Sequence, residues 1–337
     1  MGNNQNSKNK NKKEKLEIGE QINKYNEIKS KYILKQIFDN VTKNKYLNII
    51  KYNKNIQQKL EIGLNDYKES CILYSSIIIN LIPKKNLYGK FINIINKADK
   101  KYYHIYFNNK KNEKRKYHIK QTDKINKIKI TIDYQITSLA HLFSECECIE
   151  SISFQQFYRN NNTDMDCVFN NCSNLKNIDL SEFNTTQVKR MDNMFNGCTS
   201  LKKLDLSKFE TNNVEYMKGM FSDCKSLINI NIKSFNTNTV FNISYMFNKC
   251  FSLTQLDLSN FDTSNVRDMS YMFNECKELI KLNVSNFNID NTKFMEYMLY
   301  NCIKLKYIDI SNFKFNPVNL IKFSHIVNLI KNNYYQS

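Results

Sequence analysis

Apolar residues recur at a fixed interval of 26 residues through the second half of the chain. Each repeat has a cysteine followed by apolar residues three, six and eight positions later. The cysteines are Cys146, Cys172, Cys198, Cys224, Cys250, Cys276 and Cys302. A period this constant predicts a solenoid, because one short unit cannot bury its apolar stripe alone and must stack on its neighbours.

The sequence after each cysteine predicts a short strand. In one repeat Leu201, Leu204 and Leu206 have the spacing L-x-x-L-x-L, and Phe209 closes the segment. Alternate side chains of a strand face opposite sides, so the leucines are expected inside and the residues between them outside. This is the spacing of a leucine-rich repeat.

In the segment before each cysteine, the apolar residues have a different period. Val188, Met191, Met194 and Phe195 are separated by steps of three and four, which predicts a short helix or 3₁₀ turn. The connecting segments, such as residues 184–187, are rich in Asn, Asp and Thr, and these residues favour turns and helix N-caps.

Repeats such as residues 268–276 (DMSYMFNEC), followed by the segment from Leu279 to Phe287, resemble the BspA-type leucine-rich repeats of bacterial and protist proteins. The resemblance covers roughly residues 139–313. It implies a curved, β-lined solenoid and a role in adhesion or protein binding. Members of that family are often secreted or attached to a surface, whereas we expect no signal peptide here.

The first 130 residues have other patterns. Apolar residues at helical spacing between Ser30 and Leu60 predict a helical hairpin that turns near residues 43–45. Strand-like text follows at residues 77–79, 102–107, 117–119 and 128–132, with residues 108–116 read as a basic hairpin loop. This β-rich segment is expected to cover the exposed N-terminal end of the solenoid.

The expected fold class is therefore α/β: a leucine-rich-repeat solenoid of 26-residue repeats, preceded by a helical hairpin and a small β-rich capping domain. We predict a disordered basic tail at 1–29, the hairpin at 30–70, the capping domain at 71–138, the solenoid at 139–315 and a C-terminal cap at 316–337.

The net charge also differs between the first 130 residues and the rest of the chain. Residues 1–130 contain 30 Lys and Arg against 11 Asp and Glu, whereas the remainder contains 20 against 21. The basic part is expected to be drawn to anionic surfaces. An AT-rich genome, which favours lysine codons, is the alternative source of this charge.

Gly2 follows the initiator methionine, and lysines recur from Lys8 to Lys15. This arrangement is typical of a myristoyl group with a basic patch, and it predicts lipidation of Gly2 and contact with an anionic membrane. The usual Ser or Thr at position six is replaced by Asn6, with Ser7 one place late. A solvated tail is the alternative.

Catalytic, cofactor and metal sites are not expected. The four histidines lie in no metal-binding motif, no cysteine pair has C-x-x-C spacing, and Gly-rich phosphate loops are absent. The cysteine column is read as small buried thiols in a reducing compartment. The longest apolar run, Cys71 to Ile82, is too short to span a membrane. We expect a non-enzymatic protein in the cytoplasm or peripheral on a membrane.

Outward-facing strand residues of the solenoid are the candidate binding residues, because partners commonly use the concave face of such a sheet. The candidates for a protein partner are Lys202, Lys203, Ile228, Ile280, Lys281 and Tyr307.

Three other functions stay open. Residues 33–41 faintly resemble the start of an F-box, which would imply a substrate adaptor of a ubiquitin ligase. A surface adhesin of the BspA type is the second alternative. Nucleic-acid binding through residues 1–130 is the third, although nucleic acid is not the expected partner. The oligomeric state is left open.

Overall fold

The computed structural model describes residues 25, 28, 30–39, 47, 50, 51, 53–312 and 314. The chain forms two compact units, Met1–Tyr74 and Ser75–Ser337, and each is described by itself. The predicted C-terminal cap at 316–337 lies outside the described residues, as does the predicted tail apart from residues 25 and 28.

The first unit contains the helices α2 (Lys31–Asp39), α4 (Lys54–Lys59) and α5 (Leu64–Leu73). Leu34, Ile50 and Ile56 form its buried apolar cluster. The side chain of Asn53 caps α4 by accepting a hydrogen bond from the Ile56 amide at 3.1 Å. The predicted division between residues 70 and 71 lies within α5, and the predicted turn at 43–45 lies outside the described residues.

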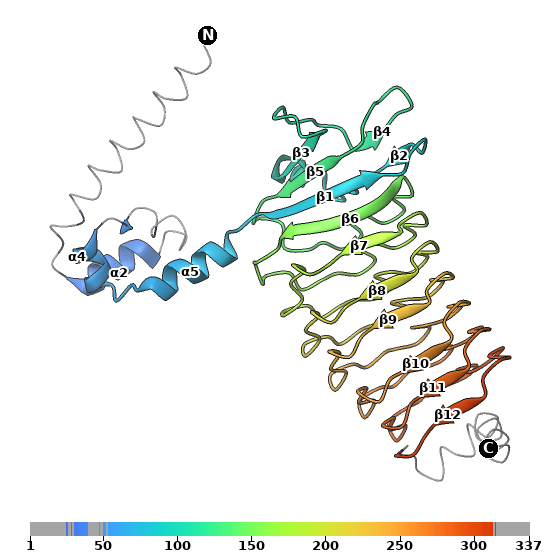
Figure 1. Ribbon diagram of the computed structural model, residues 1–337. Coiled ribbons are helices and arrows are strands. Elements are labelled where there is room, and N and C mark those ends of the chain that lie inside the picture. The colour runs from blue at the N-terminus through green and yellow to red at the C-terminus, as the bar shows by residue number, and fades with distance from the viewer. Residues whose placement is uncertain are drawn as a thin grey trace. The chain divides into compact units, whose positions relative to one another are not determined.

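The second unit begins with an antiparallel capping sheet (Figure 1). Its strands are β1 (Ile77–Pro83), β3 (Tyr103–Phe107), β5 (Ile128–Ile132) and β6 (Ile149–Gln156), in the order β3-β5-β1-β6. Alternate residues such as Ile79, Ile105 and Ile130 are fully buried beneath it. This alternation explains why these strands were readable from the sequence.

The segment at 108–116 is not the predicted hairpin loop. β3 pairs with β5, whereas β4 (His118–Ile119) pairs with β2 (Gly89–Lys90), and the short 3₁₀ helix η1 (Lys97–Tyr102) precedes β3. The Lys114 amide donates to the Ile105 carbonyl at 2.8 Å, so the segment folds back over the edge of β3. It thereby covers part of a strand edge that would otherwise be unpaired.

The solenoid continues from β6 as coils that each contribute one parallel strand of three residues (Figure 1). These strands are β7 (Asn177–Asp179), β8 (Lys203–Asp205), β9 (Asn229–Asn231), β10 (Gln255–Asp257), β11 (Lys281–Asn283) and β12 (Tyr307–Asp309). Each paired residue faces the residue 26 positions away, as in Leu256 beside Leu282 and Leu282 beside Ile308. The register therefore equals the sequence period.

The segment before each cysteine is a row of tight turns rather than a helix. The Phe195 amide donates to the Met220 carbonyl of the next coil at 2.9 Å, while the next amide, of Asn196, donates to Asn193 within its own turn at 3.1 Å. In a helix these amides would donate to carbonyls of the same helix. Because some of them donate to the next coil instead, the segment cannot form a helix. Asn193 and Gly197 adopt the left-handed conformation, with φ of 54° and 71°.

Asn and Asp side chains form the corners of each coil. In one coil Asp257 accepts from the Ser259 amide at 3.0 Å, Asp262 from the Ser264 amide at 2.9 Å, and Asp268 from the Ser270 amide at 3.0 Å. Each is a side chain that bonds the backbone two residues on and so stabilises a turn. These corners explain how the chain turns repeatedly with so few glycines.

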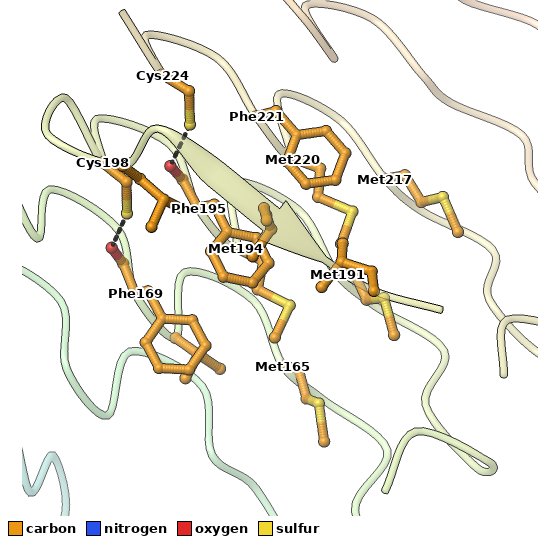
Figure 2. Close-up of a cluster of buried hydrophobic side chains, with 14 of the residues drawn as sticks. Met165, Phe169, Met191, Met194, Phe195, Cys198, Met217, Met220, Phe221 and Cys224 are labelled. Atoms are coloured by element: carbon orange, nitrogen blue, oxygen red, sulfur yellow. Dashed lines mark hydrogen bonds between the residues drawn. The ribbon is translucent and has the colours of Figure 1, made fainter. Parts of the chain in front are cut away.

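Identical side chains stack along the solenoid axis in its core (Figure 2). The rings of Phe169 and Phe195 are stacked at 5.2 Å between centroids, and those of Phe195 and Phe221 at 5.9 Å. The thiols of Cys198 and Cys224 each donate to a carbonyl of the previous coil, Phe169 and Phe195, at 3.2 Å. Burial raises the pKa of the Cys224 thiol to about 12, so it stays protonated.

A buried threonine column makes a second connection between coils. The Thr211 hydroxyl donates to the Asn236 carbonyl at 2.8 Å and accepts from the Asn236 amide at 2.7 Å. In the first coil the same position holds Arg159, which is fully buried and donates to the Asp133 carbonyl at 2.7 Å. The first coil thus replaces a coil-to-coil bond with one to the residue that follows β5 of the capping sheet.

Candidate protein-binding surface

The exposed side chains of β7 to β12, together with the residue just before each strand, form one surface that we call the strand face. Lys203 and Asp205 are exposed on either side of buried Leu204, and Gln255 and Asp257 flank buried Leu256 in the same way. The hydrophobic residue in the middle of each strand holds its neighbours outward.

All six candidate binding residues lie on the strand face. Lys202, Lys203 and Lys281 are exposed, and Ile280 is half-buried. Ile228 is 50% exposed and Tyr307 is 55% exposed. The structure does not gather them at one point, because Lys202 and Lys203 line one hollow, Lys281 and Tyr307 line another, and Ile228 and Ile280 line neither.

The first hollow has a volume of about 760 Å³ and spans β6, β7 and β8. Its lysines differ in their partners. Lys176 forms an ion pair with Glu150 at 2.8 Å, whereas Lys202 and Lys203 form none with any described residue. The polar residues that line it are Ser151, Ser153, Asn177, Asp179, Ser200 and Ser226.

The second hollow has a volume of about 300 Å³ and spans β10, β11 and β12. The ammonium group of Lys281 lies 5.8 Å from the centre of the Tyr307 ring, a cation–π contact. Asp257 and Asp309 line the same hollow. It therefore combines an aromatic side chain with both signs of charge.

The recurring Asp or Asn at the end of each strand bonds the backbone, as the sequence suggested. Asp205 accepts from the Ser207 amide at 3.0 Å, and this bond holds the pKa of its carboxyl below the ordinary value. Asp179 accepts from both the amide and the hydroxyl of Ser181, at 3.1 and 2.7 Å. The main role of these carboxylates is to stabilise the corners of the coils, although they are also exposed on the strand face.

The serines of the first hollow were not among the predicted binding residues. Ser151 and Ser153 lie in β6, which pairs with β1 of the capping sheet on one side and with β7 of the solenoid on the other. Ser200 and Ser226 stand two residues after their cysteines, in a column that continues as Ser252. This recurring polar position beside the recurring leucines was the feature of the sequence that could have identified these serines.

Two predicted features fall on other parts of the chain. Gly2 and the lysines from Lys8 to Lys15 lie outside the described residues. Residues 33–39 of the F-box-like segment are on α2, where Leu34 is buried and Ile33 is 48% exposed; residues 40 and 41 lie outside the described residues. Among the described residues no group of His, Cys, Asp and Glu could hold a metal ion. The helices in the described part of the chain fall short of the length and hydropathy that crossing a bilayer requires.

Parallel strands at a 26-residue register, one apolar core and a broad exposed strand face define a leucine-rich-repeat solenoid, a class of scaffold that presents an extended surface for binding. A family model described as "Mycoplasma protein of unknown function, DUF285" matches residues 137–255 and 227–332, more than half of the chain. The chain belongs to this family. The match and the repeat register confirm the resemblance to BspA-type leucine-rich repeats.

A crystal structure of a leucine-rich repeat protein from Bacteroides ovatus is similar to the chain at 17% sequence identity, with a TM-score of 0.28. The similarity covers 57% of this chain and 66% of that protein. No curated protein matches the sequence.

Proposed function

We propose that the chain is a non-enzymatic scaffold that binds another protein on its strand face. The observation that carries this proposal is the position of the six candidate residues on one exposed face that contains two hollows. Stacked strands supply a surface whose backbone is already ordered by hydrogen bonds between coils, so little backbone entropy is lost when a partner binds.

The chemistry of the face suits a protein partner. Ile228 and Tyr307 expose apolar surface of the kind that becomes the buried centre of an interface. Lys202 and Lys203, without ion pairs in the described part of the chain, are available to orient and attract a partner. Apolar anchors surrounded by charged groups are typical of protein interfaces.

A quantitative capture experiment tests the proposal. Tagged full-length protein, produced in its native cell, is compared with an Ile228→Asp, Tyr307→Asp variant by mass spectrometry of the co-purifying proteins. The matched control is Phe294→Asp, Ile303→Asp, because these residues are 54% and 74% exposed but lie outside the strand face. We expect the strand-face variant alone to lose partners. Equal losses in both variants, or losses in neither, would contradict the proposal.

We also propose that the N-terminus tethers the scaffold to a membrane through acylated Gly2 and the lysines that follow it. The sequence supports this, since one acyl chain binds membranes only marginally and the lysines supply the second signal. Intact-mass measurement and membrane fractionation of the native protein and of Gly2→Ala provide the test. An unacylated Gly2 in the native protein would exclude the tether.

The adaptor, adhesin and nucleic-acid alternatives stay predictions. The capture experiment separates the first from the scaffold, because a ubiquitin-ligase adaptor recovers a ligase core subunit through residues 30–60 and keeps it in the strand-face variant.

A further inference from the structure

The strand face does not end at the first coil but continues across the capping sheet. β6 pairs in antiparallel fashion with β1 and in parallel fashion with β7. The register sets Lys129 beside Asn80, Asn80 beside Ser153, and Ser153 beside Asp179. Lys129, Asn80 and Ser153 alternate with buried neighbours. Asp179 lies between half-buried Ile178 and buried Leu180, so all four face the same side. The first hollow therefore lies in the middle of a longer surface.

This surface lies beside a large excess of positive charge. Residues 75–133 contain 15 Lys and Arg against 4 Asp and Glu, a net charge of +11. Three of the four acids already have side-chain partners: Glu113 and Asp133 contact the His104 ring at 3.2 and 3.1 Å, and Asp123 is paired with Lys116. If codon usage alone produced this charge, the coils would have a similar net positive charge. The coils are instead nearly neutral.

The two hollows of the strand face differ in charge. The first contains three lysines and one aspartate, and its serines and asparagine add hydrogen-bond donors. The second contains one lysine and two aspartates. Complementary charges across an interface determine how a partner is oriented and which of its residues meet which positions. Because the two hollows differ in charge, a partner can bind the strand face in one orientation in preference to the reverse.

We propose that the first hollow and the adjoining capping sheet bind an acidic peptide segment of the partner protein, with Lys202 and Lys203 as the residues that contact its carboxylates. This inference rests on the proposed protein-binding function and adds the chemistry and position of one contact. Ser200 and Ser226 hydroxyls donate hydrogen bonds to the same segment. Lys176 contributes less, because Glu150 already neutralises it.

A peptide fits this site better than nucleic acid or lipid. Non-specific single-strand binders stack bases on aromatic side chains, and the described residues that line the hollow include none. In the capping domain the rings of Tyr102 and Tyr117 already carry the ammonium groups of Lys101 and Lys100, at 4.8 and 5.0 Å. A flat bilayer does not reach into a hollow, whereas an extended side chain does.

The test measures fluorescence anisotropy of a labelled peptide of alternating Glu and Ser with the full-length protein, at fixed moderate salt. A peptide with Gln in place of Glu is the neutral probe. We expect Lys202→Glu, Lys203→Glu to weaken binding of the acidic peptide about tenfold or more, since two attractive contacts become repulsive. Both lysines are exposed, and an unchanged circular dichroism melting curve will show that the variant folds.

The matched control is Lys218→Glu, Lys293→Glu, which changes net charge equally at exposed positions of the turn segments. We expect this control to weaken binding by no more than about twofold, the residual effect of long-range charge. Equal losses in the two variants would overturn the proposal, as would equal binding of the neutral peptide or no binding of the acidic one. Tighter binding of oligothymidylate or phosphatidylserine vesicles, lost in the Lys202, Lys203 variant, would instead assign the site to those ligands.

Failure of this inference is distinguishable from failure of the proposed function. If the acidic peptide does not bind but the Ile228, Tyr307 variant still loses partners in the capture experiment, the strand face remains a protein-binding surface with another specificity. If neither variant changes anything, both proposals fail.

Discussion

Within each coil, the core and the strand face vary very differently from one repeat to the next. The stacked core position holds Phe143, Phe169, Phe195, Phe221, Phe247 and Phe273, followed by one other apolar residue, Leu299, in the coil of β12. The position just before each strand holds Lys176, Lys202, Ile228, Thr254, Ile280 and Lys306. Stacking at one spacing requires one shape, so the core column is restricted by packing, whereas the exposed position is not. Variation at the exposed position is therefore available for recognition.

The largest expected effect is in the core. Phe221 stacks between Phe195 at 5.9 Å and Phe247 at 5.3 Å. Phe221→Ala removes the ring and leaves a cavity that rigid neighbouring coils cannot fill, so we expect a loss of ~3–5 kcal/mol in the free energy of unfolding. Urea denaturation monitored by circular dichroism measures it. Tyr307→Ala on the strand face is the control, with an expected change within about 0.5 kcal/mol. Similar losses at both positions would remove the distinction between core and face.

A smaller effect is expected for the hydrogen bonds between coils. Thr211→Val keeps the shape of the buried side chain but leaves the half-buried amide and carbonyl of Asn236 without the hydroxyl. We expect a loss of about 2 kcal/mol, since buried polar groups are costly to leave unpaired. The same denaturation experiment applies. Thr254→Val, at an exposed strand-face position, is the control and should change little. An unaffected Thr211→Val would show that the buried threonine contributes shape alone.

The smallest effect, for each unit of pH, is a dependence of stability on pH. Burial raises the pKa of Cys224 to about 12, above the ordinary value of 9.0. The folded state thus keeps a proton that the unfolded state loses, so this contribution is complete below pH 9 and declines as the pH rises towards 12. Its slope approaches about 1.4 kcal/mol per pH unit for one thiol. Stability measured at successive pH values above 9 should therefore fall less steeply in Cys224→Ala than in the native protein. Identical slopes would mean that the thiol is hydrated.

The sequence revealed the core of this fold more fully than its turns. The 26-residue period predicted the strand register, and alternation in residues 128–132 predicted β5, because both follow directly from which side chains are buried. The turn segments were predicted to be a short helix or a 3₁₀ turn, and the structure has tight turns with hydrogen bonds between residues three apart, such as Asn196 to Asn193. Met191, Met194 and Phe195 have steps of three and four in either structure, since tight turns also bring every third or fourth residue inward. Apolar spacing alone cannot separate the two.

The left-handed positions explain part of that ambiguity. Gly219 and Asn193 are residues that favour a positive φ, but Tyr271 occupies the equivalent position with φ of 57°. Its ring stacks between Tyr245 at 4.7 Å and Tyr297 at 5.0 Å, and these contacts with neighbouring coils offset the local strain. Contacts between residues 26 positions apart are invisible to local propensity, as is the grouping of serines from β6 and two later coils around one hollow.

The most direct test of the strand face as a protein-binding surface is site-specific photo-crosslinking in the native cell. A photoreactive amino acid replaces Lys203 on the strand face or, in a separate protein, Lys218 on a turn segment; both positions are exposed. The account predicts that position 203 yields a crosslinked protein partner and that position 218 does not. A partner crosslinked from 218 and absent from 203 would contradict it.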